Sequence, residues 1–247
     1  VGGGGPGAML SAGEFGRRAR AAIAAIRSRG WEPLLVGGSG LYLRAVLGGL
    51  DEGLPHDSAL RETLRARVRT EGVEALHAEL VRLDPATAAA TSPRDAQRVT
   101  RALEVIALTG RPVSELRRKG RRVEIPAQIV VLDRGREDLE ARIRARVGEM
   151  IAAGLEAEVR GLLARGLGPE IPALRSVGYA ETIRMLRGEL SRDAWPDAIA
   201  VNTRRYAKRQ RTWFRGLEGA AWVQVESDEP EAAVLGRVIA ALQDRPA

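Results

Sequence analysis

Apolar residues recur three or four positions apart over most of the chain, a spacing that predicts amphipathic helices. The first predicted helix runs from Ser11 to Gly30, with Glu14 placed to complete a capping box with Ser11. Further helices are predicted from Leu41, from Asp57, over 73–83, from Asp84, over 95–108, 137–153 and 155–164, from Tyr179 to Gly188, from Ser191 to about Arg215, and over 229–242.

Three shorter runs predict strands. Pro33–Val36 and Gln128–Leu132 are continuously apolar, as is typical of buried parallel strands, and Trp222–Val225 is the last predicted strand. The first run is followed by the loop Gly37–Gly40 and a helix, an order that indicates an α/β fold.

The pattern also divides the chain. Residues 1–10 are glycine-rich, and we expect them to be disordered. Residues 51–98 are charged and helical without a strand signal, so we interpret them as a helical insertion domain. Residues 11–50 and 99–247 then form the α/β core, which ends in basic helices.

Composition narrows the chemistry. The 247 residues contain no cysteine, which excludes disulfides and cysteine-based zinc sites and fits a reducing cytoplasm. No apolar run is long enough to predict a membrane span. The net charge is 39 − 32 = +7, which suggests a polyanionic partner. However, all basic residues except Lys119 and Lys208 are arginine, so codon bias explains the charge equally well.

The distribution of charge is more informative than its sum. Arg204, Lys208, Arg211 and Arg215 recur at helical spacing on one stripe, and Arg205 and Arg209 widen it. No acidic residue interrupts the chain between Ile199 and Leu217, whereas a merely solvated helix face usually mixes signs. The stripe therefore favours a phosphate-backbone contact. Ile199, Tyr206 and Trp213 recur on a neighbouring face, which we expect to pack on the core.

Three weaker candidates have ordinary alternatives. Gln97, Arg98 and Arg101 could donate forked hydrogen bonds to base edges and phosphates, or lie on a solvated face. Ser39 could offer a hydroxyl to a phosphate or base, or belong to a simple strand-to-helix turn. Arg142 and Arg146 could form salt bridges with Glu140 or Glu149.

Five segments, taken in order, resemble the tRNA dimethylallyltransferase (tRNA isopentenyltransferase) family. They are Val36–Tyr42, Gln97–Val105, Thr109–Pro112, Arg175–Tyr179 and Tyr206–Phe214. The resemblance runs from Ser11 to Trp222 and implies a P-loop-kinase-like parallel sheet. It also implies transfer of the dimethylallyl group of dimethylallyl diphosphate to N6 of the adenosine 3′ of the anticodon.

The resemblance implies the partners as well. They are the tRNA anticodon stem-loop, dimethylallyl diphosphate and Mg2+, and we expect a cytoplasmic monomer without membrane contact. Ser39 takes the place of a catalytic hydroxyl, and Arg142 that of a diphosphate-binding arginine. The implied tRNA contacts are Arg61, Gln97, Arg98, Arg101, Arg175, Gly178, Tyr179, Lys208, Arg209, Gln210, Arg211, Trp213 and Arg215.

The sequence departs from the family pattern at two places. Ala180 stands where the family commonly has arginine, so one phosphate contact would be lost. In the family, a P-loop with the pattern G-x-x-x-x-G-K-[ST] and a catalytic Asp precede the region that Ser11–Arg29 resembles. Neither feature occurs in this sequence. We therefore expect an incomplete sheet without its first strands, an exposed apolar face, and an inactive or weakly active fragment. A non-catalytic tRNA-binding protein and an adenylate isopentenyltransferase relative are the alternatives.

Overall fold

The computed structural model describes residues 10–48, 54–119 and 125–243. The chain forms two compact units, unit 1 (Val1–Leu47 and Ile125–Ala247) and unit 2 (Gly48–Glu124). Unit 1 is interrupted by unit 2, and Ile125 N–H donates to the Leu47 carbonyl at 2.8 Å where the chain returns. Nearly all of the segment 1–10 that we expected to be disordered lies outside the described residues.

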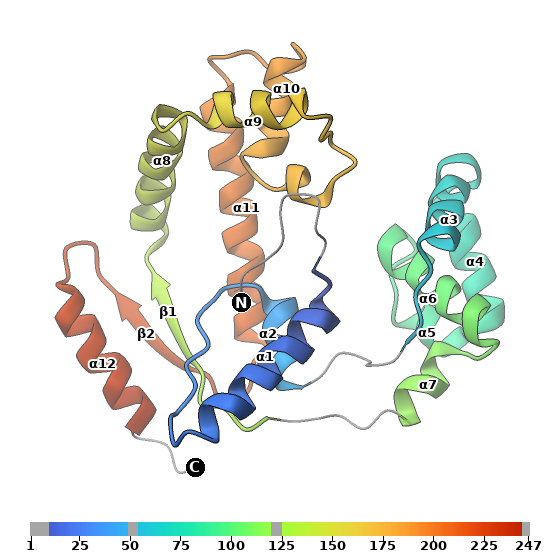
Figure 1. Ribbon diagram of the computed structural model, residues 1–247, viewed down its shortest axis with the longest axis horizontal. Coiled ribbons are helices and arrows are strands. Elements are labelled where there is room, and N and C mark those ends of the chain that lie inside the picture. Colours follow the sequence, from blue (N-terminus) through green and yellow to red (C-terminus); the bar gives the residue numbers. More distant parts are fainter. Residues whose placement is uncertain (1–9, 49–53, 120–124, 244–247) are drawn as a thin grey trace. The chain divides into compact units, whose positions relative to one another are not determined.

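Unit 1 contains a two-stranded parallel sheet, β1 (Val130–Arg134) and β2 (Ala221–Val225), with Val130 opposite Ala221. Helix α12 (Glu231–Gln243) packs along this sheet, as Figure 1 shows. The other elements of the unit are α1 (Ala12–Arg27), α2 (Gly40–Leu47), α8 (Arg136–Ala152), α9 (Leu155–Ala164), a 3-10 turn (Pro172–Arg175), α10 (Tyr179–Leu186) and α11 (Trp195–Arg215).

The core of unit 1 lies where α8, α9 and α10 meet the first half of α11. Ile143 and Val147 of α8 pack there with Trp195 and Ile199 of α11. The apolar spacing predicted for these helices is confirmed, because Leu139 and Met150 also pack against this cluster. The second half of α11 extends beyond this core, toward the sheet and the loop 37–40 (Figure 1).

The described residues of unit 2 form the helices α3 (Ser58–Glu71), α4 (Val73–Leu83), α5 (Pro85–Ala89), α6 (Ala96–Thr109) and α7 (Val113–Lys119). Leu64, Leu76, Leu80 and Leu103 contribute to its buried core. The helices of this unit thus continue past the 51–98 segment that we predicted, because α6 packs on α3 and α4, and α7 on α5 and α6.

Helix caps follow the sequence signals closely. The side chains of Ser11, Asp57, Asp84 and Asp95 each accept a hydrogen bond from a backbone N–H in the first turn of the following helix. The capping box at Ser11 is only half formed, since the Glu14 carboxylate instead receives Arg17 and Arg18.

The strand predicted at Pro33–Val36 does not form, which corrects that prediction. Leu34 and Val36 are 83% and 82% exposed. A strand needs a neighbouring backbone to receive its hydrogen bonds, and the two strands of the described residues pair only with each other. Of the predicted P-loop-kinase-like sheet, the described part of the chain therefore shows two parallel strands. The second predicted strand begins at Val130 rather than Gln128, and Leu132 on it is exposed.

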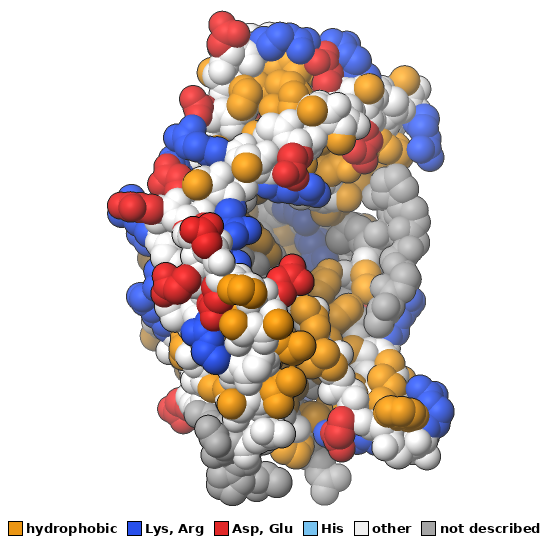
Figure 2. Space-filling view, turned by 90° about the vertical axis from the view of Figure 1, so that its left-hand side faces the viewer, with side chains coloured by type: hydrophobic (Ala, Val, Ile, Leu, Met, Phe, Trp, Pro, Cys, Tyr) orange, Lys and Arg blue, Asp and Glu red, His pale blue; other side chains and the backbone are white. Residues whose placement is uncertain are grey.

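The surface of unit 1 near the sheet mixes charge signs. Figure 2 turns this side to the viewer and shows Lys/Arg and Asp/Glu side chains interspersed, with hydrophobic side chains gathered in the lower half. Leu132, Leu235 and Ile239 are among the exposed apolar residues of the sheet and α12. In the described residues, no helix combines the length and apolar character needed to cross a membrane.

Asp84 and Glu104 are buried carboxylates of unit 2. Asp84 accepts from Thr87 N–H at 3.1 Å, Thr87 Oγ1 at 2.6 Å and Ser114 N–H at 2.9 Å. Burial opposes ionisation of Asp84, but these hydrogen bonds outweigh it and lower its pKa. The pKa of Glu104 is also lowered: burial acts against ionisation, and hydrogen bonds from Arg101, Asp57 N–H and Arg61 overcome it.

We predict that replacing Leu34 and Val36 together by serine leaves thermal unfolding nearly unchanged but reduces self-association. Exposed substitutions change stability by roughly 0.5 kcal/mol or less, and exposed apolar patches promote aggregation. Tryptophan fluorescence and light scattering during heating measure the two effects. The control is Val46→Ala at a fully buried position, which should lower the unfolding temperature. A large drop for the serine variant would show that the segment packs in solution.

We also predict that unit 2 loses stability in acid. The pKa values of Asp84 and Glu104 lie below their ordinary values of 3.8 and 4.5, so their contribution is full above those values and declines as pH falls below them. Amide-exchange protection factors of α5 and α6 should therefore fall between about pH 5 and pH 3. Glu104→Gln should remove the part of this decline that Glu104 causes. Unchanged protection over this range would contradict the prediction.

Candidate functional site

The glycine loop 37–40 packs directly on the basic helix α11. Gln210 donates its side-chain N–H to the Gly38 carbonyl at 2.8 Å. A Cβ at Gly38 would collide with the Gln210 amide, and one at Gly40 with the Trp213 indole. The two glycines therefore permit an approach that any side chain would block. Two features that the sequence singled out separately thus meet in one place.

Ser39 is held in this loop with its hydroxyl available. Its carbonyl accepts from Leu43 N–H at 2.9 Å and so opens α2. Within the described part of the chain the Ser39 hydroxyl has no hydrogen-bond partner, and the residue is half-buried. A hydroxyl of this kind can donate to a phosphate or base oxygen.

An open pocket of about 370 Å³ lies on the same helix. It is lined by Lys208, Arg209, Thr212 and Trp213. Trp213 contributes both to this pocket and to the contact with Gly40, so the pocket adjoins the glycine loop. Two cations beside an indole suit a ligand that combines an anionic group with a flat or apolar part.

The cations of α11 fall into two sets. Arg204 pairs with Glu140 of α8, and Arg211 pairs with Asp133 of β1 at 2.5 Å. Lys208 and Arg215 are exposed and have no carboxylate partner among the described residues. Arg209 lies over the Tyr206 ring, 5.8 Å from its centre. Two of the predicted stripe residues therefore fasten the helix, and the others remain open to a ligand.

Tyr206 corrects one prediction from the sequence. We expected it to pack on the core with Ile199 and Trp213, but it is 43% exposed. Ile199 is buried, and Trp213 is half-buried against the glycine loop. The seven-residue spacing persists along α11, whereas the core cluster receives buried residues only from the helix's first half.

The segment 175–179 is shaped by internal hydrogen bonds. Arg175 is exposed and donates Nε to the Pro169 carbonyl at 2.7 Å. Gly178 is buried with a φ of +97°, so it forms the turn rather than a surface. The Tyr179 hydroxyl donates to Glu158 at 2.6 Å, and this bond, together with burial, raises the pKa of Tyr179. Arg175 is thus the exposed cation of the segment.

Arg142 is tied into the sheet region. Its Nε donates to Asp138 at 3.1 Å and its Nη2 to the Ser227 carbonyl at 3.1 Å. Arg142 therefore forms a salt bridge, as the alternative interpretation predicted, but its partner is Asp138 rather than Glu140 or Glu149. Arg146 pairs with Glu149 at 3.0 Å. About half of the Arg142 side chain is still exposed.

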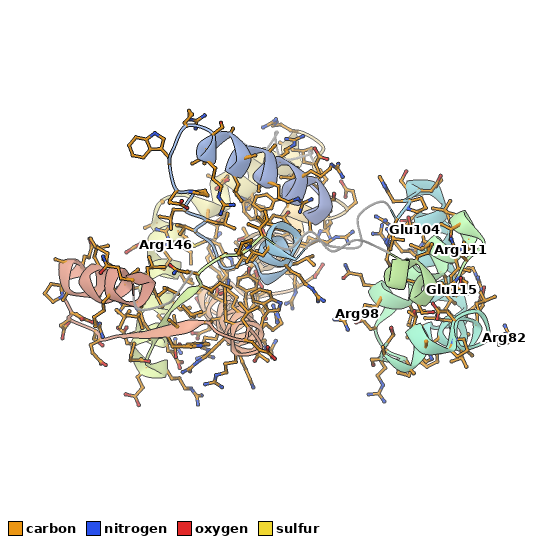
Figure 3. All side chains as sticks on the ribbon, turned by 90° about the horizontal axis from the view of Figure 1, so that it is seen from below. Arg82, Arg98, Glu104, Arg111, Glu115 and Arg146 are labelled. Atoms are coloured by element: carbon orange, nitrogen blue, oxygen red, sulfur yellow. The ribbon has the colours of Figure 1, made fainter. Side chains whose placement is uncertain are left out.

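The candidates in unit 2 differ in how freely they face solvent. Gln97 is exposed, and the side chain of Arg98 is 72% exposed with a 3.4 Å contact to Asp95. Figure 3 labels Arg98 on the outside of this unit and Glu104 among its helices. Arg61 and Arg101 instead both bind Glu104, at 3.0 and 2.8 Å.

Glu104 was missed by the sequence analysis. It is fully buried, yet it organises two of the predicted arginines. The available signal was its place in the apolar run Ala102–Ile106, where an isolated acidic residue on the core face needs a partner.

The described residues do not by themselves suit Mg2+. Nowhere in 10–48, 54–119 and 125–243 do three His, Asp or Glu side chains converge. Magnesium prefers octahedral oxygen ligands and often takes several of them from water and substrate phosphates.

Comparisons with known proteins agree with the motifs. The profile of the IPP transferase family matches residues 5–217. The tRNA dimethylallyltransferase 1 of Trichlorobacter lovleyi is 44% identical over 216 residues, which are 87% of this chain and 71% of that protein. The tRNA dimethylallyltransferase of Thiobacillus denitrificans is 42% identical over 240 residues, 96% of this chain and 77% of that protein.

Solved structures show the same fold. The full-length tRNA isopentenylpyrophosphate transferase of Bacillus halodurans matches with a TM-score of 0.64 and 33% identity, over 97% of this chain and 76% of that one. A eukaryotic dimethylallyltransferase acting on tRNA has a TM-score of 0.73 at 22% identity, over 96% and 63%, and supports the fold alone. With a family profile that spans most of its length and relatives above 40% identity, the chain belongs to the tRNA dimethylallyltransferase (IPP transferase) family.

Proposed function

We propose that this chain acts in the transfer of a dimethylallyl group from dimethylallyl diphosphate to N6 of the adenosine 3′ of the anticodon in tRNA. Its family membership supports the reaction class. The observation that carries the proposal is the packing of the glycine loop, with the open Ser39 hydroxyl, against the cationic helix α11.

The reaction makes specific demands on a protein. The bond between the allylic carbon and the diphosphate oxygen breaks, and the diphosphate leaves with the electron pair. The N6 lone pair forms the new carbon–nitrogen bond, and a base takes the N6 proton. Cations must therefore face the leaving group, and the adenine must be pulled from the stack and held.

The residues of α11 can meet two of these demands, because they offer cations for the leaving group and an aromatic side chain that can hold the adenine. Lys208, Arg209 and Arg215 can bind phosphate groups, because none of them is neutralised by a carboxylate within the described residues. Trp213 can stack on a base. The Ser39 hydroxyl can bind the adenine or the diphosphate from the loop that rests on Trp213. In unit 2, Gln97 and Arg98 can contact the anticodon loop, and in unit 1 so can Arg175.

The residues described above do not supply the magnesium ligands, the P-loop or the catalytic Asp of the reaction. Magnesium would take its ligands mainly from the diphosphate and water, since the described carboxylates do not converge. The expected P-loop and catalytic Asp are not in the printed sequence. We therefore propose that the 247-residue chain by itself binds tRNA well and transfers the group weakly or not at all.

We predict that the open cations of α11 carry the affinity for RNA. Lys208→Gln and Arg215→Gln should each weaken binding of an anticodon stem-loop. Each should also reduce the slope of log affinity against log salt concentration by about 0.7 for a lost phosphate contact on single-stranded RNA. Fluorescence anisotropy over a series of salt concentrations measures both quantities.

Arg204→Gln is the matched control, since it removes the same charge from the same helix. Because Arg204 is engaged by Glu140, this variant should lower stability more and the salt slope less than Arg215→Gln. Equal slopes for the two variants would mean that the helix acts only through its total charge, and would contradict the assignment.

We predict separately that the chain binds but barely prenylates the stem-loop. Labelled dimethylallyl diphosphate, magnesium and the stem-loop are incubated with this chain or with the full-length Bacillus halodurans relative. Little label should enter the RNA with the 247-residue chain. Turnover near that of the full-length protein would refute the weak-activity proposal. Competition by AMP as strong as that by the stem-loop would instead favour a small-molecule substrate.

A further inference from the structure

The carboxylate of Glu104 joins helix α6 of unit 2 to the start of helix α3. Glu104 of α6 is fully buried. It accepts from the Asp57 N–H at 2.9 Å, which lies at the start of α3. Arg61 of α3 donates Nη2 at 3.0 Å to both carboxylate oxygens, and Arg101 of α6 donates Nη1 at 2.8 Å.

The two arginines are held in place, but some of their N–H groups still have no acceptor among the described residues. Arg101 also donates to the carbonyls of Pro55 and Leu54, at 2.9 and 3.2 Å. Its Nε and the Nη1 of Arg61 have no acceptor among the described residues. About one third of each side chain is exposed, 33% for Arg61 and 36% for Arg101. N–H groups of both guanidinium groups thus remain for a ligand.

The charge balance of this cluster is positive. One carboxylate faces two guanidinium groups, so the cluster keeps a charge of one after pairing. A buried carboxylate fixes its partners strongly, because losing them would leave an uncompensated charge in the interior. The arginines therefore do not have to be ordered when an anion arrives, which lowers the entropic cost of binding.

We propose that Glu104 is a positioning residue that holds Arg61 and Arg101 as a paired site for one phosphodiester of the RNA backbone. This inference rests on the proposed tRNA substrate. Glu104 itself touches no RNA in this arrangement and acts only through the two arginines. A phosphodiester fits because its two oxygens can each accept from one guanidinium group.

A purely electrostatic role of Glu104 predicts the opposite sign. Glu104→Gln removes a negative charge near a polyanion, which alone would strengthen RNA binding. A positioning role predicts weaker binding, although the net charge of the protein rises by one. A merely structural role would lower the unfolding temperature without changing affinity below the transition. The sign of the change in affinity therefore separates the three.

The test measures binding of an anticodon stem-loop to the full chain, below the unfolding transition of every variant. We expect Glu104→Gln and Arg61→Gln each to weaken binding by roughly tenfold, as for one lost charge-assisted contact. The double variant should bind no more weakly than Arg61→Gln alone, because both changes break the same site. Arg65→Gln, an exposed arginine of α3 paired with Glu62, is the charge-matched control and should bind nearly as wild type.

The outcomes are distinct from those of the proposed function. A wild-type chain that fails to bind the stem-loop overturns the proposed function and this inference with it. A wild type that binds, with Glu104→Gln binding equally or more tightly, overturns the inference alone. If Glu104→Gln does not fold, the double replacement of Arg61 and Arg101 by lysine keeps both charges and loses the forked geometry. It should bind roughly tenfold more weakly with a smaller salt slope, and unchanged binding would refute the site.

Discussion

The basic stretch of α11 from Arg204 to Arg215 contains no acidic residue, so its counter-charges must come from other elements of the fold. This constraint determines how α11 is attached to the rest of unit 1. Like charges one turn apart destabilise an isolated helix. In α11 two of them are answered by carboxylates on other elements, Glu140 of α8 and Asp133 of β1. Both arginines lie C-terminal to the buried residues of α11, which are Trp195, Ile199 and Ala200. Apolar burial at Ile199 therefore attaches the first part of α11 to unit 1, and the two ion pairs attach the part that follows.

The same half of α11 also fixes the glycine loop. Gln210 binds the Gly38 carbonyl, and the Trp213 indole occupies the space that a side chain at position 40 would need. Because Gln210 and Trp213 alternate with Lys208, Arg209 and Arg215 along the helix, docking groups and open cations are interleaved. Any displacement of the loop would therefore displace the cations relative to Ser39. Pre-organised charge of this kind is the largest single source of catalysis in many transfer reactions.

Local signals were predictable from the sequence, and long-range pairing was not. Caps depend on a few adjacent residues, and Ser11, Asp57 and Asp84 accept the expected hydrogen bonds. The helix predicted from Ser191 is the exception, because α11 begins at Trp195 without a side-chain cap. The apolar run Pro33–Val36 reads as a buried strand, but a strand is defined by its neighbour, which a local pattern does not contain. Similarly, the spacing of α11 predicted a cationic stripe but could not show that Arg204 and Arg211 are already paired. Motif order, in contrast, was sufficient for the family.

In unit 2, Arg61 and Arg101 pair with a buried carboxylate, whereas Arg98 pairs with a partly exposed one. The difference between these pairs explains why a net charge of +7 says little about binding. An exposed ion pair such as that of Arg98 with Asp95 contributes little and exchanges readily for a phosphate. Removing one partner of a buried pair costs roughly 3–5 kcal/mol, so Arg61 and Arg101 will not leave Glu104 to reach a ligand. They can bind a phosphate only where they already stand. Affinity for RNA then depends on which cations are open and which are oriented, and the count of basic residues records neither.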